Sequence, residues 1–78
     1  MNNVIEHVRE FIKTSLMVPE DINDNTSLMS SGVIDSMGII EVISFIEDNY
    51  SIVVGDDEVS EENFDSIEKI AFFIQNRL

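Results

Sequence analysis

The sequence predicts an all-α fold, a small four-helix bundle of three main helices and one short helix, with a long first loop. Two observations favour this class. Apolar residues recur at three- and four-residue spacing in three segments, and polar residues suited to capping precede them. In addition, the only strand-like run, residues 52–54, has no evident partner strand. With 78 residues, the chain is expected to form a single domain spanning residues 1–78.

The first helix is expected over residues 3–16. Asn3 can cap its N-terminus, with Glu6 as the partner of a capping box, and Pro19 prevents its continuation. The apolar residues of this segment form one stripe: Val4, Ile5, Val8, Phe11, Ile12 and Leu16.

A long polar connection follows over residues 17–35. A loop of this length is uncommon in a compact domain. We therefore expect apolar side chains within it to pin it across the helices: Ile22, Leu28, Met29, Val33 and Ile34.

The second helix is expected over residues 36–50, with Asp35 or Ser36 as its N-cap. Spacing at 100° per residue gives its core face as Ile39, Ile43, Ile46 and Tyr50, flanked by Ile40 and Val42. The opposite face carries Met37, Glu41, Ser44, Phe45 and Asp48. We expect Met37 to be exposed, whereas Phe45 fits exposure and core packing equally well.

The remaining chain predicts an extended plug into the core, one helical turn and a last helix. Residues 52–54 form the plug, residues 60–64 the turn, and residues 66–77 the helix, with Asp65 and Glu68 as a capping box. The buried stripe of the last helix is expected to be Ile67, Ile70, Ala71, Ile74 and Leu78.

The charge balance excludes several partners. Sixteen acidic residues against four basic ones give a formal net charge of −12. Nucleic acids and anionic membrane surfaces need a cationic protein surface, so neither is expected to bind. The acidic surface either only keeps the protein soluble or also steers basic partners toward it. No signal peptide or membrane span is apparent, so we expect a cytoplasmic protein without membrane insertion. We also expect the protein to be a monomer.

Enzymatic and metal chemistry lack the necessary residues. The chain has no cysteine and one histidine, His7, which is expected to be a solvated helix residue. A calcium loop counted from Asp21 would need glycine at its sixth position and glutamate at its twelfth, where Thr26 and Gly32 stand. We predict no catalytic residue and no metal site.

The most informative motif is Gly32-Val33-Ile34-Asp35-Ser36-Met37-Gly38. It places the Ser36 hydroxyl at the start of a long helix, directly after a loop. The free N–H groups and the dipole of a helix N-terminus favour an anion. They would therefore partly compensate the negative charge of a phosphodiester attached there. Taken alone, the pattern favours an ordinary N-cap serine, because Asp-Ser before an apolar helix is common.

With this motif, the whole chain resembles the acyl carrier proteins and their peptidyl and D-alanyl carrier relatives. The shared features are the first helix, the long loop, an Asp-Ser-Leu-like motif with Met37 in place of leucine, and the acidic second helix. A late Asn63-Phe64-Asp65-Ser66-Ile67 run enters the final helix. Two residues separate Gly32 from Asp35, a spacing closer to D-alanyl and other stand-alone specialised carriers than to carriers of fatty acid synthesis.

The resemblance implies a non-enzymatic carrier with 4′-phosphopantetheine attached covalently to Ser36. A phosphopantetheinyl transferase would attach the arm, and a ligase or acyltransferase would load an acyl or aminoacyl group as a thioester for lipid, polyketide or related biosynthesis. Enzymes with basic docking surfaces would bind Asp35, Met37, Glu41, Phe45, Glu47 and Asp48. The alternative is an acidic adaptor that binds a basic partner and carries no prosthetic group.

Overall fold

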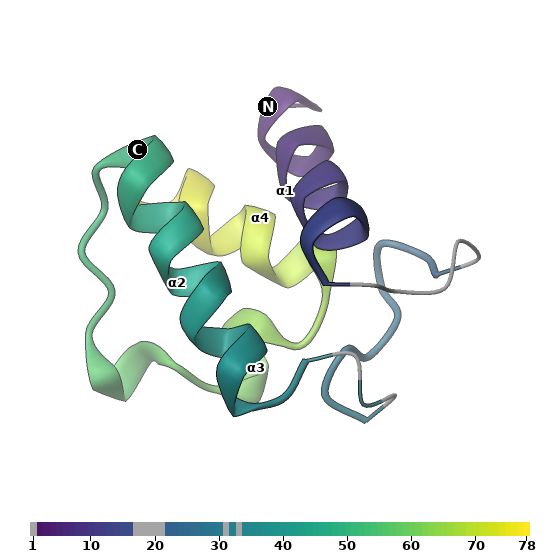
Figure 1. Ribbon diagram of the computed structural model, residues 1–78. Coiled ribbons are helices and arrows are strands. Elements are labelled where there is room, and N and C mark those ends of the chain that lie inside the picture. Colours follow the sequence, from purple (N-terminus) through teal and green to yellow (C-terminus); the bar gives the residue numbers. More distant parts are fainter. Residues whose placement is uncertain (1, 17–21, 31, 33) are drawn as a thin grey trace.

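The protein is all-helical (Figure 1), as the sequence predicts. The computed structural model describes residues 2–16, 22–30, 32 and 34–78. Within them lie the helices α1 (Asn2–Ser15), α2 (Ser36–Tyr50), α3 (Glu61–Phe64) and α4 (Ile67–Gln75), and a 3₁₀ turn, η1 (Asp56–Glu58). The three main helices and the one short helix are those that the sequence predicts, whereas η1 was not expected.

The core lies where α1, α2 and α4 converge. α1 packs against α4, and α3 packs against the start of α4 (Figure 1). The side chains with no exposed surface come from all four helices and from the first loop, and include Val8, Ile12, Leu28, Ile46, Phe64, Ile70 and Ile74. Because every helix contributes to one cluster, burial of this apolar surface holds the helices together.

Helix α1 begins earlier than the capping pattern predicts. The helix already includes Asn2, so Asn3 lies inside it. A capping residue needs a non-helical backbone, and the predicted role of Asn3 as the N-cap is therefore wrong. The predicted stop at Pro19 lies outside the described residues.

The first loop is held by its apolar residues, as predicted. Leu28 and Ile34 are buried, and Ile22 and Met29 pack partly buried against the core. The Ile34 N–H donates to the Leu28 carbonyl at 3.0 Å, which closes the loop just before α2. The predicted anchor Val33 lies outside the described residues.

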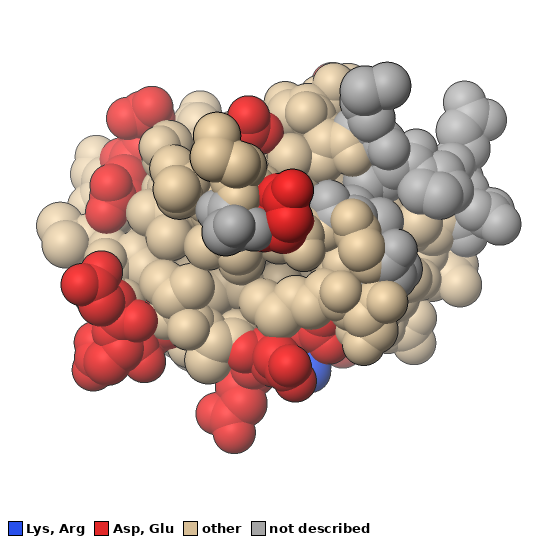
Figure 2. Space-filling model, turned by 60° about the horizontal axis from the view of Figure 1, so that its bottom comes forward, with Lys and Arg blue, Asp and Glu red and all other residues tan. Residues whose placement is uncertain are grey.

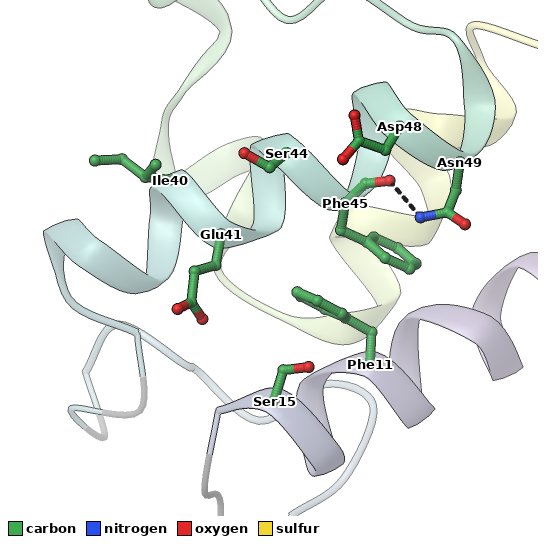
Figure 3. A pocket seen from close by; sticks show the side chains of 8 residues that line it. All are labelled: Phe11, Ser15, Ile40, Glu41, Ser44, Phe45, Asp48 and Asn49. Atoms are coloured by element: carbon green, nitrogen blue, oxygen red, sulfur yellow. Dashed lines mark hydrogen bonds between the residues drawn. The ribbon is translucent and has the colours of Figure 1, made fainter.

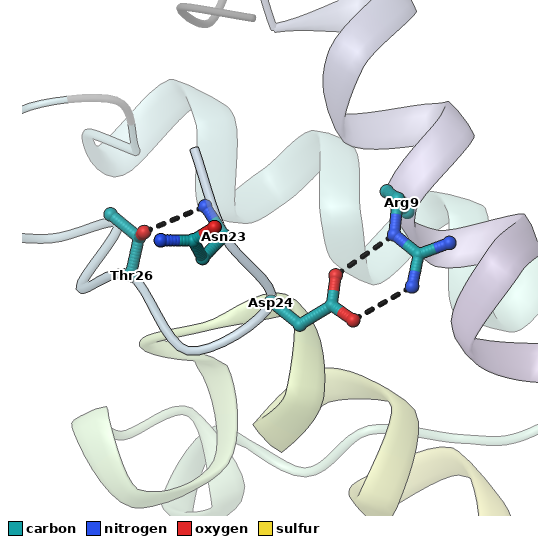
Figure 4. A network of polar contacts seen from close by, with 4 residues as sticks. All are labelled: Arg9, Asn23, Asp24 and Thr26. Atoms are coloured by element: carbon teal, nitrogen blue, oxygen red, sulfur yellow. Dashed lines mark hydrogen bonds and ion pairs between the residues drawn. The ribbon is translucent and has the colours of Figure 1, made fainter. Parts of the chain in front are cut away.

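Polar contacts tie the same loop to the start of α4. The Leu28 N–H donates to the Asp65 carbonyl, and the Asp65 carboxylate accepts hydrogen bonds from the Ser27 hydroxyl and the Met29 N–H. Earlier in the loop, the Asp24 carboxylate accepts two hydrogen bonds from the Arg9 guanidinium of α1 (Figure 4). The loop leading to α2 is thus fastened to both α1 and α4.

Helix α2 has the predicted bounds but a rotated core face. Ile46 is buried as predicted, but the other buried side chains are Val42 and Phe45, while Ile39 and Ile43 are only partly buried. The buried stripe is displaced by roughly a quarter turn from the predicted one. The cause is tertiary, because the Phe45 ring stacks on Phe11 of α1 with 4.3 Å between ring centroids.

The segment after α2 enters the core through one side chain. Ile52 is buried, whereas Val53 is 80% exposed and Val54 is partly buried. Successive side chains of an extended backbone point in opposite directions, so the predicted plug holds for Ile52 and not for Val53.

The start and end of α4 differ from the prediction. The side chain of Ser66, not of Asp65, accepts a hydrogen bond from the Lys69 N–H and caps the helix, so the predicted Asp65–Glu68 capping box is wrong. Leu78 is exposed, contrary to the prediction, because α4 ends at Gln75. Phe73 is buried in addition to the predicted Ile67, Ile70, Ala71 and Ile74.

Candidate functional site

Of the two N-cap residues that the sequence offers for α2, the structure shows Asp35 and not Ser36. Asp35 has an extended backbone and its carboxylate accepts a hydrogen bond from the Gly38 N–H at 2.9 Å, so Asp35 is the N-cap and Ser36 is the first helical residue. Buried Ile34 fixes the chain directly before the cap. The side chain of Ser36 lies outside the described parts of the structure, and its predicted exposure stays a prediction.

The surroundings of this helix start are suited to a phosphodiester. Asp35 and Met37, on either side of Ser36 in the chain, are both exposed, with Met37 at 69%. An α-helix leaves its first N–H groups without partners inside the helix, and its dipole makes this end favourable for anions. The Gly38 N–H already donates a hydrogen bond to the Asp35 carboxylate. Because α2 has 15 residues, its dipole is that of a full-length helix, and its N-terminus can partly compensate the negative charge of a phosphodiester.

Most of the residues predicted to bind partners lie around one exposed face of α2. Glu41 and Asp48 are exposed, and the helical period places both on the same side as Met37. Glu47 is exposed on a flank of this face, where its carboxylate accepts a hydrogen bond from the Val54 N–H at 3.1 Å. The structure therefore places these acidic residues along and beside the exposed face of α2 that begins at Met37.

Phe45 does not share this exposure. Only 8% of its surface is exposed, and its ring stacks on Phe11 and makes a T-shaped contact with the His7 ring, with 4.8 Å between centroids. Of the two alternatives for Phe45, core packing is the one observed. Its predicted role in partner binding stays a prediction. Phe45 also lines a neighbouring groove.

That groove lies between α1 and α2 and was not predicted (Figure 3). It is open to solvent and has a volume of about 500 Å³. Its lining includes Phe11 and Ser15 of α1 and Ile40, Glu41, Phe45 and Asp48 of α2. The helical period already groups Glu41, Phe45 and Asp48 on one face of α2, but only the packing of α1 beside that face forms the groove. No local pattern in the sequence could have indicated that packing.

His7 is exposed as predicted but is not only solvated. Its Nδ1 atom shares a hydrogen bond of 2.8 Å with the hydroxyl of Tyr50 at the end of α2. Burial raises the pKa of the Tyr50 hydroxyl, so this hydroxyl stays protonated at neutral pH. The contact joins α1 to α2 at the far end of the groove from Ser15.

The electrostatic surface is strongly acidic. Figure 2 shows Asp and Glu side chains spread over the displayed face, with Lys or Arg visible only at its lower edge. Residues 2–16, 22–30, 32 and 34–78 form two ion pairs, Arg9–Asp24 and Arg77–Glu58. Neither pair includes a carboxylate of α2, so the α2 carboxylates have no basic partner within these residues.

Within the same ranges, no three His, Asp or Glu side chains are placed to hold a metal ion. None of the described helices has the length and apolar character needed to span a membrane.

Two comparisons with known proteins indicate one family, and a third finds a similar fold. The family model described as "Phosphopantetheine attachment site" matches residues 6–74. The acyl carrier protein of Buchnera aphidicola subsp. Schizaphis graminum is 30% identical over 78 residues, which covers 99% of this chain and 96% of the relative. A solved chain described as "Crystal structure of FAD-dependent dehydrogenase" is similar in fold, with a TM-score of 0.79 and 25% identity over 86% of this chain and 97% of that chain.

Proposed function

This chain belongs to the phosphopantetheine-attachment family of acyl carrier proteins, and from that premise we propose that Ser36 is its attachment residue and that its cargo is an acyl or aminoacyl group. The protein is a carrier rather than an enzyme, and its cofactor is covalent 4′-phosphopantetheine. The cargo, the attachment residue and a place of action in the cytoplasm are the parts that we propose.

The geometry at the start of α2 is the observation that supports Ser36. Its backbone is the first of a 15-residue helix capped by Asp35, and the residues on either side are exposed. A hydroxyl at this position can be reached by a transferase, and the helix N-terminus stabilises the negative charge that attachment introduces there.

In the proposed modification, this chain supplies the nucleophile and the transferase supplies the catalysis. The Ser36 oxygen forms a bond to the coenzyme A phosphorus that bears pantetheine. The pyrophosphate bond breaks, adenosine 3′,5′-bisphosphate leaves with the electron pair, and the transferase accepts the serine proton. Once bound, the group supplies a terminal thiol that holds cargo as a thioester. The rest of this chain keeps α2 in place and presents its exposed face.

Substitution of Ser36 tests the assignment. Ser36→Ala should keep its helical circular dichroism but gain no mass when incubated with a phosphopantetheinyl transferase and coenzyme A. Ser44→Ala is the matched control, because Ser44 is an exposed serine of the same helix and should leave modification intact. Modification of Ser36→Ala would exclude Ser36 as the attachment residue. An unmodified wild-type protein, in the cell and with the transferase, would favour the acidic adaptor.

We further propose that the carboxylates of α2 steer basic partner enzymes toward the arm. Exposed charges of this kind raise association rates more than affinity, and salt screens them. Glu47→Lys should therefore lower kcat/KM for arm transfer at low salt and leave it nearly unchanged at high salt. The matched control is Glu62→Lys, which reverses the charge of another exposed glutamate, on α3 and away from α2. Equal effects of the two substitutions would show that only net charge matters.

A further inference from the structure

We propose that the groove between α1 and α2 binds the cargo, and that the cargo it fits is an aminoacyl group with an apolar side chain and a free amino group. This inference rests on the proposed function, because the cargo must be tethered at Ser36 to reach the groove. It adds to that function a binding site and a chemical class of cargo.

The floor of the groove is apolar and already formed. The Phe11 and Phe45 rings stack at 19° between their planes, and Phe45 is held further by the edge contacts with His7 and Tyr50. Ile40, 59% exposed, lies at one end (Figure 3). Fixed apolar surface of this kind binds hydrocarbon. An apolar amino-acid side chain can therefore lie on the floor.

The rim of the groove is negatively charged. Glu41 and Asp48 are exposed residues on the same side of α2, two turns or roughly 10 Å apart, and both line the groove. Neither is used by the two ion pairs formed within the described part of the chain. An ammonium group next to the apolar floor would be attracted by both carboxylates, whereas a neutral acyl group would gain nothing from them.

The groove lies within reach of Ser36. Helical rise places Phe45 about 14 Å along α2 from Ser36. The phosphopantetheine arm is comparable in length to about five extended residues, roughly 17 Å. Glu41 lies at the end of the groove nearer Ser36 and Asp48 at the other end (Figure 3), so the arm can deliver its terminal group between them.

Size favours the cargo over a segment of a partner enzyme. A volume of about 500 Å³ lies in the range of small-molecule sites. Protein–protein interfaces are usually far more extended than one such groove. A tethered group also reaches a millimolar effective concentration, so the weak contacts of an open groove are sufficient to hold it. A free peptide would not have this advantage.

The test compares two arms that differ only in the amino group. Wild-type protein is loaded at Ser36 from coenzyme A analogues that carry leucyl or 4-methylpentanoyl through a stable amide. Backbone amide shifts are then recorded against the unloaded holo protein. We expect the leucyl arm to shift the resonances of Phe11, Glu41, Phe45 and Asp48, and the 4-methylpentanoyl arm to shift them much less. In Glu41→Gln/Asp48→Asn, the leucyl shifts should fall to the 4-methylpentanoyl level, whereas in Asp57→Asn/Glu62→Gln they should persist.

Each outcome supports or overturns a distinct statement. If intact mass shows that no arm is attached at Ser36, the proposed function fails. If the arm is attached but the groove resonances do not move, this inference fails and the proposed function stands. Equal shifts from both arms would make the groove a purely apolar site and overturn the aminoacyl assignment. Groove shifts that appear only when a basic partner protein is added would overturn cargo binding in favour of docking.

Discussion

At the scale of single residues, Asp24 joins three parts of the molecule. Its carboxylate accepts two hydrogen bonds from Arg9 of α1, at 2.8 and 2.7 Å, and its carbonyl accepts one from the Glu68 N–H of α4. Both side chains of the ion pair are about one-third exposed, at 34% and 35%, so water and salt weaken it. Hydrogen bonding to Arg9 lowers the pKa of Asp24 below its ordinary value of 3.8.

Asp24→Asn should lower the free energy of unfolding by about 1 kcal/mol at neutral pH. This value lies at the upper end of the free energies measured for exposed ion pairs. Because the pKa of Asp24 is lower in the folded protein, the unfolded chain takes up the proton first as pH falls. The contribution is therefore complete above the ordinary value of 3.8 and is lost below it. Urea unfolding of both proteins should show a constant difference from pH 7 to about 5 that shrinks toward pH 3.

Asp57→Asn is the control for this ion pair, because Asp57 is exposed and belongs to neither ion pair of the described residues. It removes the same charge and should not destabilise the protein. A difference between wild type and Asp24→Asn that is as large at pH 3 as at pH 7 would contradict the role of the carboxylate charge.

Local patterns in the sequence narrow the capping residues to neighbouring candidates but do not choose between them. At α2 the candidates are Asp35 and Ser36, and the structure shows that Asp35 is the cap, because its carboxylate accepts a hydrogen bond from the Gly38 N–H. Before α4, Asp65 and Ser66 are both good capping residues, and the sequence alone does not choose between them. The choice follows from the distant loop, because Ser27 and Met29 bind the Asp65 carboxylate and Ser66 is left to cap the helix.

At the scale of elements, helix positions follow from the sequence more reliably than helix faces. Capping residues and apolar spacing predict the bounds of α2, but its apolar residues nearly encircle the helix, so periodicity defines the buried stripe poorly. The Phe45–Phe11 stack decides the rotation of α2, and this contact joins residues far apart in the chain. For the same reason, the groove between α1 and α2 could not be predicted.

Helix α2 also contains a residue that weakens it. Gly38 lies in its first turn, where glycine costs about 1 kcal/mol relative to alanine. An added Cβ atom would meet Asp35 Oδ1 at 3.5 Å and Ile34 Cγ2 at 3.6 Å, which are ordinary contacts. Gly38→Ala should therefore raise the free energy of unfolding by about 0.5–1 kcal/mol, measured by urea denaturation.

Gly32→Ala is the matched control for Gly38. A Cβ atom added at Gly32 would lie in open space, but the φ of +79° at this residue is unfavourable for alanine. This substitution should destabilise the protein by about 1 kcal/mol. Destabilisation by Gly38→Ala would show that the start of α2 is constrained by more than the contacts described.

At the scale of the whole molecule, charge is the property that the sequence defines most directly. A formal net charge of −12 is carried by a molecule whose largest extent is 29 Å. At about 0.01 M salt the Debye length is roughly 30 Å, so nearly all the carboxylates repel one another across the molecule. This repulsion opposes the compact state, and the two ion pairs formed by the described residues offset only part of it.

The melting temperature should therefore rise when NaCl is increased from about 0.01 to 0.1 M, because the Debye length falls from roughly 30 to 10 Å and repulsion within the molecule weakens. Asp57→Asn/Glu62→Gln should melt higher than wild type at low salt and respond less to added salt. Both side chains are exposed and lie outside the groove and the ion pairs. Circular dichroism melts at several salt concentrations measure both effects. A melting temperature that does not change with salt, or identical slopes for the two proteins, would mean that self-repulsion does not limit the stability of this fold.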